Sequence, residues 1–119
     1  MGKFIVRREG ERAARLRLPE VEARHGNLMD GVHGGMILAM IDIALFAGIY
    51  KVLEIDPSGA VTVDVSCQFV GAGVLGTPLD AVVEVMKETG RLVFLRGTVE
   101  QEHGLVAGFQ ATVRKPVRR

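Results

Sequence analysis

Tryptophan is absent from the sequence, and cysteine occurs once, at Cys67. A single cysteine cannot form an intrachain disulfide, which favours a reducing compartment such as the cytoplasm. Cys67 lies in an apolar run, so we interpret it as a core side chain and not as a nucleophile. Strong net charge is also missing, because 15 lysines and arginines are balanced by 14 aspartates and glutamates. The resulting net charge of +1 gives no indication of nucleic-acid binding.

Several targeting and ligand signals are missing as well. No cluster of cysteines and histidines has the spacing of metal ligands, so we expect no metal and no other cofactor. Met1–Lys3 runs directly into a short apolar patch and then into charge, unlike a signal peptide. The chain has no internal repeat, and its 119 residues are within the range of one domain. We therefore expect residues 1–119 to form a single cytoplasmic domain.

The longest apolar run is Gly34–Tyr50, whose 17 residues contain one charge, the carboxylate of Asp42. The run is longer than a typical strand and does not alternate, so it predicts a helix from Gly34 to about Leu53. It is shorter than the ~20 apolar residues of a membrane span, so we expect no membrane. A helix that is apolar on nearly all sides is expected to be buried on nearly all sides. A buried carboxylate is costly unless it is paired or hydrogen-bonded, which makes Asp42 the most informative residue.

Strand patterns surround this helix. Before it, two short strands flank a turn at Glu9–Gly10. After a turn at Asp56–Gly59, the pattern has a period of two, and short turns join the last three strands into a predicted antiparallel meander. The predicted strands are Phe4–Val6, Ala13–Leu18, Val61–Phe69, Ala81–Lys87, Leu92–Val99 and Leu105–Val113. One helix packed on a curved antiparallel sheet is an α+β fold.

Basic residues cluster near both ends of the sequence. The clusters are Arg7, Arg8, Arg12, Arg15 and Arg17, and Arg114, Lys115, Arg118 and Arg119. We interpret most of them as solvated strand faces and a tail. The alternative is a basic rim that attracts a phosphorylated ligand.

A motif stands at the start of the predicted helix: Asn27-x-x-x-Gly31-x-His33-Gly34-Gly35, with Asp42 nine residues after His33. With the strand–helix–four-strand order, this motif resembles the hotdog-fold thioesterases, specifically acyl-CoA thioesterases of the phenylacetic-acid-degradation type. The HFPG-type motif of a related dehydratase is absent. The resemblance implies a hotdog fold, an acyl-CoA substrate, and a homodimer or dimer of dimers.

Gly34 and Gly35 fall in the first helical turn, where backbone N–H groups lack intrahelical acceptors. The helix dipole adds partial positive charge there, and the missing side chains let a carbonyl approach the backbone. These are the requirements of an oxyanion site for acyl transfer. The alternative is that the glycines only permit tight packing or an unusual turn.

Asp42 is the candidate for the reactive carboxylate. Burial among apolar neighbours should make it more basic, which suits a general base or a nucleophile. No basic residue lies within a helical turn of it, since Lys51 is nine positions away. The alternative is a buried aspartate that is satisfied by hydroxyls or amides and has no chemical role. Many relatives carry glutamate at this position, so the motif leaves base and nucleophile both open.

Helix geometry separates the two groups. Gly35 and Asp42 are seven residues apart and therefore about 10 Å apart along the axis. Attack on a carbonyl requires reacting atoms about 3–3.5 Å apart, so one helix cannot both hold the carbonyl and attack it. An antiparallel second copy would bring its Asp42 to the first copy's glycines. This predicts a two-fold dimer with shared sites, the arrangement that the resembled family uses.

Three further residues have candidate roles. Asn27 can position water or the thioester, or it is an ordinary turn residue. His33 orients the loop, assists the leaving thiolate, or is only a helix cap. By the resemblance, Thr62 corresponds to a hydroxyl residue near the catalytic carboxylate, although threonine is also a good strand former. The overall prediction is an acyl-CoA thioesterase, and the alternative is a non-catalytic acyl-CoA-binding or sensing domain.

Overall fold

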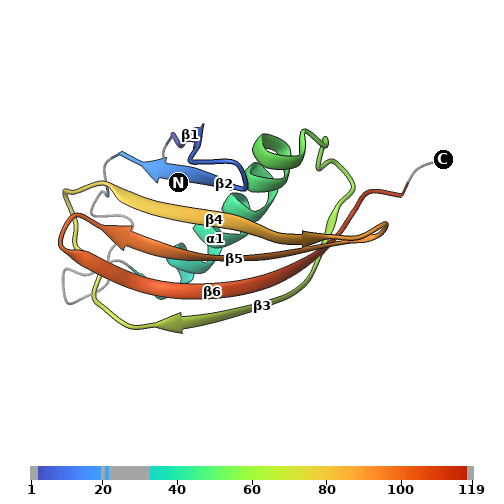
Figure 1. Cartoon of the computed structure of the whole chain (residues 1–119). Coiled ribbons are helices and arrows are strands. Elements are labelled where there is room, and N and C mark those ends of the chain that lie inside the picture. The colour runs from blue at the N-terminus through green and yellow to red at the C-terminus, as the bar shows by residue number, and fades with distance from the viewer. Residues whose placement is uncertain (1–2, 20, 22–32, 118–119) are drawn as a thin grey trace.

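A computed structural model describes residues 3–19, 21 and 33–117, which form one six-stranded antiparallel sheet and one helix (Figure 1). The elements are β1 (Ile5–Arg8), β2 (Ala13–Leu18), α1 (Gly34–Gly48), η2 (Ile49–Leu53), β3 (Val61–Phe69), β4 (Leu79–Glu88), β5 (Leu92–Gln101) and β6 (Gly104–Arg114). Each predicted strand is present, and most extend one or two residues beyond the predicted bounds.

The strands are ordered β1-β2-β4-β5-β6-β3. The predicted meander is confirmed, because β4 pairs with β5 and β5 with β6, both antiparallel. β3 pairs with β6 and forms one edge of the sheet, so within the described residues its other side has no strand neighbour. The long strand that follows the helix in sequence is therefore an edge strand.

The helix begins and ends as predicted, but its last turn differs. His33 is the N-cap, and α-helical geometry runs from Gly34 to Gly48. Ile49–Leu53 continue as a π-helix, which ends at Glu54 in the left-handed conformation with φ 57°. Gly48 permits close packing on the sheet, because a β-carbon there would lie 2.7 Å from Cγ1 of Val83.

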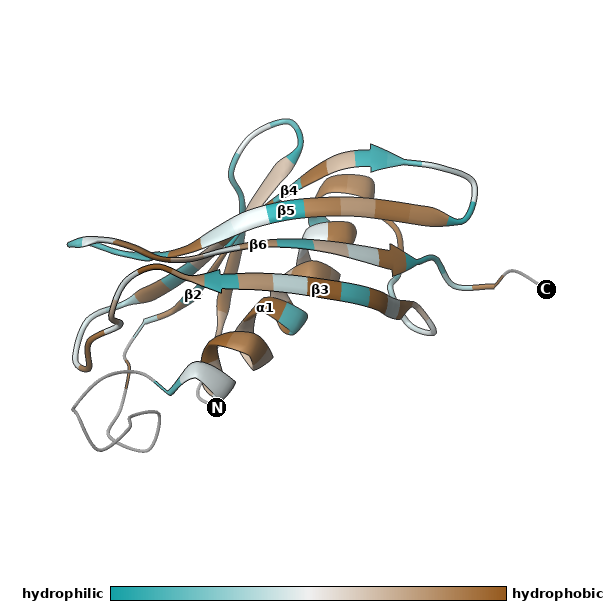
Figure 2. Ribbon diagram, turned by 90° about the horizontal axis from the view of Figure 1, so that it is seen from below, coloured by the Kyte–Doolittle hydropathy of each residue, from teal (hydrophilic) through white to brown (hydrophobic). Residues whose placement is uncertain are grey.

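The core lies between α1 and one face of the sheet, with the helix packed mainly against β4 and β2. The buried helix residues recur every three or four positions, as expected for one covered face: Met36, Ile37, Met40, Ile41, Ala44, Leu45 and Gly48. On the opposite face Leu38, Asp42 and Ile43 are exposed. The prediction of a helix buried on nearly all sides is therefore wrong for a single chain, because the sheet covers only one side of it (Figure 2).

Together α1 and η2 make a helical segment of 20 residues, Gly34–Leu53. By length and composition alone this segment could cross a membrane. The prediction that it is too short considered only the apolar run Gly34–Tyr50, and the helix continues past that run. Buried core helices of soluble proteins have the same length and composition, and this helix has a buried face against the sheet.

A β-bulge interrupts β3 near its start. Thr62 pairs with Val113, and the register then shifts between Thr62 and Asp64. Val113 pairs with Thr62 and Ala111 pairs with Val65, and both of these β6 residues are buried. Because of the shift, Thr62 therefore points to the same face of the sheet as Val65. The predicted strict alternation of β3 is therefore broken, and Thr62 faces the helix.

Candidate active site

Asp42 and Thr62 lie together at the start of β3. The hydroxyl of Thr62 donates a hydrogen bond to Oδ1 of Asp42 over 3.1 Å, between positions 20 residues apart in sequence. The bulge directs Thr62 towards the helix, where it meets Asp42 on the exposed face of α1. Asp42 is exposed in the single chain, so the expected burial of its carboxylate is wrong at this level of assembly.

His33 caps the helix with its side chain. Nδ1 of His33 accepts a hydrogen bond of 2.9 Å from the backbone N–H of Gly35, and the His33 carbonyl accepts from the amides of Met36 and Ile37. In this state Nδ1 carries no proton, because it is the acceptor. One of the two amides predicted to hold an oxyanion is therefore already engaged by the cap.

Gly34 is the other predicted oxyanion residue. Within the described residues its backbone N–H donates to no acceptor. Phe69, the last residue of β3, lies beside it, because a β-carbon on Gly34 would be 3.7 Å from the ring atoms Cε1 and Cζ. This contact was not predicted, since the pattern of a strand does not reveal which of its residues meets the helix terminus.

The predicted residues thus form two groups at opposite ends of β3. Asp42 and Thr62 meet at its first residues, whereas Gly34 and His33 lie at its last. Gly34 and Asp42 are eight residues apart in α1, which is about 12 Å along the helix axis. The structure does not bring the two groups together within one chain. Asn27 lies outside the described residues.

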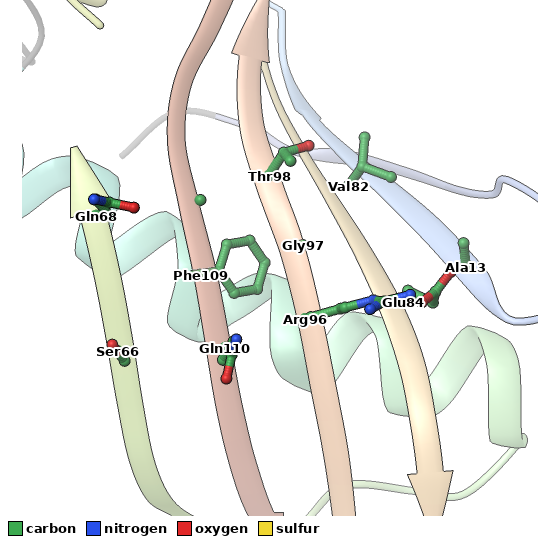
Figure 3. Close-up of a pocket in the computed structure, with 11 residues that line it drawn as sticks. Ala13, Ser66, Gln68, Val82, Glu84, Arg96, Gly97, Thr98, Phe109 and Gln110 are labelled. Carbon is green, nitrogen blue, oxygen red and sulfur yellow. Dashed lines mark hydrogen bonds and ion pairs between the residues drawn. The ribbon is translucent and has the colours of Figure 1, made fainter. Parts of the chain in front are cut away.

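Two hollows lie elsewhere on the molecule. One, of about 570 Å³, opens on the sheet face that points away from the helix, and polar side chains such as Ser66, Gln68 and Gln110 line it (Figure 3). It contains none of the predicted site residues. Its charged residues, Arg96 and Glu84, pair with each other over 2.8 Å.

The other hollow, of about 910 Å³, lies beside the turn between β4 and β5 and the C-terminal segment. Both basic and acidic residues line it: Arg91, Arg114, Lys115, Glu54, Asp56 and Glu88. Lys115 and Glu88 form an ion pair. The lining of this hollow is therefore of mixed charge. The alternative of a basic rim stays a prediction, because Arg118 and Arg119 lie outside the described residues.

The basic residues of β2 have structural partners. Arg15 and Arg17 both donate to the carboxylate of Asp80 in β4, over 2.6 and 2.8 Å. Burial raises the pKa of Asp80, but the hydrogen bonds and charges of the two arginines outweigh burial and lower it. These arginines therefore support the pairing of β2 with β4. In the part of the chain that is described, no three His, Cys, Asp or Glu side chains are placed to hold a metal ion.

Comparison with known proteins agrees with this architecture. A family model of the Thioesterase superfamily matches residues 29–107. The chain belongs to the thioesterase superfamily. Its hotdog fold and its class as a thioester hydrolase agree with the prediction. Curated protein sequences give no match.

Three solved structures illustrate the similarity of this thioesterase superfamily fold to known proteins. A mutant of the phenylacetic acid degradation protein PaaI from Thermus thermophilus is 24% identical, with a TM-score of 0.78 over 94% of this chain and 92% of that one. Zebra fish thioesterase superfamily member 2 is 22% identical, with a TM-score of 0.81 over 95% and 81%. A hypothetical thioesterase from Streptococcus pneumoniae, solved with coenzyme A, is 17% identical, with a TM-score of 0.83 over 98% and 91%.

Proposed function

We propose that this chain hydrolyses acyl-CoA thioesters at sites shared between the two copies of a two-fold dimer. The observation that carries the proposal is the placement of Asp42 with Thr62 at one end of β3 and of Gly34 with Phe69 at the other. Family membership supports the reaction class, and the coenzyme A in the Streptococcus pneumoniae protein supports the type of thioester.

Pairing of β3 with its own copy would join the two groups. β3 is an edge strand, and Val61, Val63 and Val65 are between 39% and 57% exposed, an apolar edge that invites a further strand. Antiparallel pairing along the full strand aligns the Thr62 end of one copy with the Phe69 end of the other. Asp42 would then lie near Gly34 of the partner subunit, which one chain cannot achieve alone.

Gly34 is the preferred oxyanion donor of the two glycines, because the Gly35 amide already donates to His33. In the proposed reaction the Gly34 N–H holds the thioester oxygen, where negative charge develops. Its position at the helix N-terminus adds the positive end of the helix dipole. Asn27 retains its proposed role of positioning water or the thioester.

The carboxylate of Asp42 acts either as the general base that activates water or as the nucleophile that attacks the thioester carbonyl. As a base, it takes a proton from water while the water oxygen bonds to the carbonyl carbon. The tetrahedral intermediate then expels the CoA thiolate as the C–S bond breaks, leaving the free acid. As a nucleophile, Asp42 would itself bond to the carbonyl carbon, and the CoA thiolate would leave as the C–S bond breaks. Water would then cleave the resulting anhydride to the free acid and restore the carboxylate. Thr62 orients the carboxylate in either case.

The test is turnover of a panel of acyl-CoA esters, with the released thiol measured by a thiol-reactive dye. Asp42→Asn should lower kcat by about 100-fold or more, because the amide cannot accept the proton. Asp64→Asn, a change of the same kind at an exposed aspartate of β3, is the control and should retain wild-type kcat. Full activity of a folded Asp42→Asn protein would place the chemistry elsewhere.

A binding or sensing domain is the alternative function. It predicts that the wild-type chain binds acyl-CoA in calorimetry and releases no thiol from any member of the panel. Turnover that depends on Asp42 excludes this alternative. The cytoplasmic location and the choice between dimer and dimer of dimers stay predictions.

A further inference from the structure

Four side chains lie between the two groups of the proposed site, and we call them the apolar strip. They are Leu38, Val65, Cys67 and Phe69. Leu38 is four residues from both Gly34 and Asp42 in α1, so it lies on the same helix face, between the two points where that face meets β3. It is 44% exposed. The strip therefore spans the gap between the glycine and the carboxylate.

The strand side of the strip follows from pairing in the sheet. Val65, Cys67 and Phe69 pair with Ala111, Phe109 and Ala107 of β6, all of which are buried on the helix side. After the bulge these three residues therefore face the helix side as well. Asp64, Ser66 and Gln68 are directed to the opposite face. The polar residues of this part of β3 are thus kept away from the strip.

No side chain of the strip is charged. Burial raises the pKa of the Cys67 thiol, so this group is neutral at pH 7. A carboxylate or ammonium on the acyl group would find no partner along the strip and would lose part of its hydration there. An apolar acyl group would instead remove exposed apolar surface from water, which is favourable.

Phe69 has the most specific position in the strip. Its ring lies beside Gly34, the proposed oxyanion residue, since a β-carbon there would be 3.7 Å from the ring, and Phe69 is 50% exposed. Carbon atoms next to the thioester carbonyl would therefore meet this ring first. The backbone around it is fixed by β6, since the amides of both Val70 and Gly71 donate to the carbonyl of Val106. Replacing the ring changes the strip without removing these backbone bonds.

We infer that Phe69 determines acyl-group specificity and that the preferred substrates carry an uncharged, apolar acyl group packed on its ring. This inference rests on the proposed thioesterase function and adds the substrate class to it. Phe69 acts by contact with the acyl group and takes no part in proton transfer.

The test measures kcat/KM for hexanoyl-CoA and acetyl-CoA with the same preparation of each protein. The ratio of the two values is independent of the fraction of folded protein. Phe69→Ala should lower the hexanoyl-to-acetyl ratio about 10-fold, the effect of losing contact with one or two methylene groups. Phe69→Leu should give an intermediate ratio, and it decides the test if Phe69→Ala does not fold.

Val70→Ala is the matched control, because Val70 is the next residue and is 53% exposed. It should leave the ratio unchanged. Wild-type protein should also prefer butyryl-CoA to succinyl-CoA, whose acyl group has the same number of carbons but ends in a carboxylate. The preference should be about 10-fold or more, because no strip residue pairs with that charge.

The outcomes separate the two proposals. An unchanged ratio in Phe69→Ala or Phe69→Leu, with turnover that still depends on Asp42, overturns the role of Phe69 and leaves the thioesterase proposal standing. Equal or faster hydrolysis of succinyl-CoA overturns the uncharged substrate class. Absence of Asp42-dependent turnover with every ester overturns the proposed function, and the inference fails with it.

Discussion

The sequence around Asp42 predicted that its carboxylate has a partner, but it did not identify the partner or the exposure of the side chain. Its position as the only charge in an apolar helix predicted that its carboxylate needs a hydrogen-bond partner. The partner, Thr62, is 20 residues away, and only the resemblance suggested it. The exposure of Asp42 was not predicted, because apolar neighbours on every side of a helix do not reveal which side the sheet covers.

Thr62→Val tests the hydrogen bond to Asp42. Valine keeps the branched shape that suits a strand, but it cannot donate to the carboxylate. A hydrogen bond to a charged group contributes about 1.5–3 kcal/mol, so kcat should fall about 10-fold or more. Thr62→Ser keeps the hydroxyl and should retain most of the activity. Unchanged kcat in a folded Thr62→Val protein would reduce Thr62 to a structural strand residue.

His33→Ala tests the helix cap. Loss of the acceptor for the Gly35 amide should cost about 1 kcal/mol of unfolding free energy and lower Tm by a few degrees. His33→Asn is the comparison, since asparagine is a favourable N-cap residue and should preserve most of the stability. Thermal denaturation followed by circular dichroism measures both. If the alanine variant melts with the wild type, the Nδ1 contact makes no net contribution to stability.

At the scale of elements, strands and helix were largely predictable and their exact pairing was not. Alternating residues predicted β3 within its observed bounds, Val61–Phe69, and short turns predicted the order of β4, β5 and β6. The bulge after Thr62 was missed, because one extra residue in a strand leaves no distinct sequence pattern. The π-helical turn at Ile49–Leu53 was missed for a similar reason, since it continues the same apolar run.

The pairing of β2 with β4 provides a prediction for the effect of acid. The pKa of Asp80 is lowered in the folded protein, so the stabilising effect of its ion pairs is complete above the pKa of the unfolded chain, about 4. This contribution is lost as the pH falls through the lower, folded value. Asp80→Asn should therefore be less stable than wild type at pH 7, and the difference should shrink below about pH 4. Urea denaturation at several pH values measures it, and a difference that does not depend on pH would contradict the linkage.

At the scale of the whole molecule, the single chain exposes apolar surfaces that a second copy would cover. One face of α1 is covered by the sheet, and the other exposes Leu38, Asp42 and Ile43. Beside that face, β3 ends the sheet with an apolar edge that pairs with no other described strand. A second copy on the two-fold axis of β3 would cover both surfaces and restore the burial that the sequence predicted for Asp42. The distance between Gly34 and Asp42 along α1 supports the same dimer independently of these exposed surfaces, because two copies are needed to bring Asp42 to Gly34.

Mixing two inactive variants tests this assembly directly. Asp42→Asn removes the reactive carboxylate, and Gly34→Val crowds the proposed oxyanion site, where a β-carbon alone would already touch the Phe69 ring. In a mixed dimer one site carries both changes and the other carries neither. Random reassortment makes about half of the dimers mixed, each with one intact site, so activity should return to roughly a quarter of wild type.

The control for this mixture is Asp42→Asn combined with Asp42→Ala, which cannot produce an intact site in any pairing. Mass-tagged subunits establish that mixed dimers form in both cases. Because the two changes of the first mixture lie at opposite ends of β3, recovery in that mixture alone requires a carboxylate from one copy and a helix terminus from the other. Mixed dimers without recovered activity would refute the shared site, and Asp42 would then have to act on a carbonyl held by another part of its own chain.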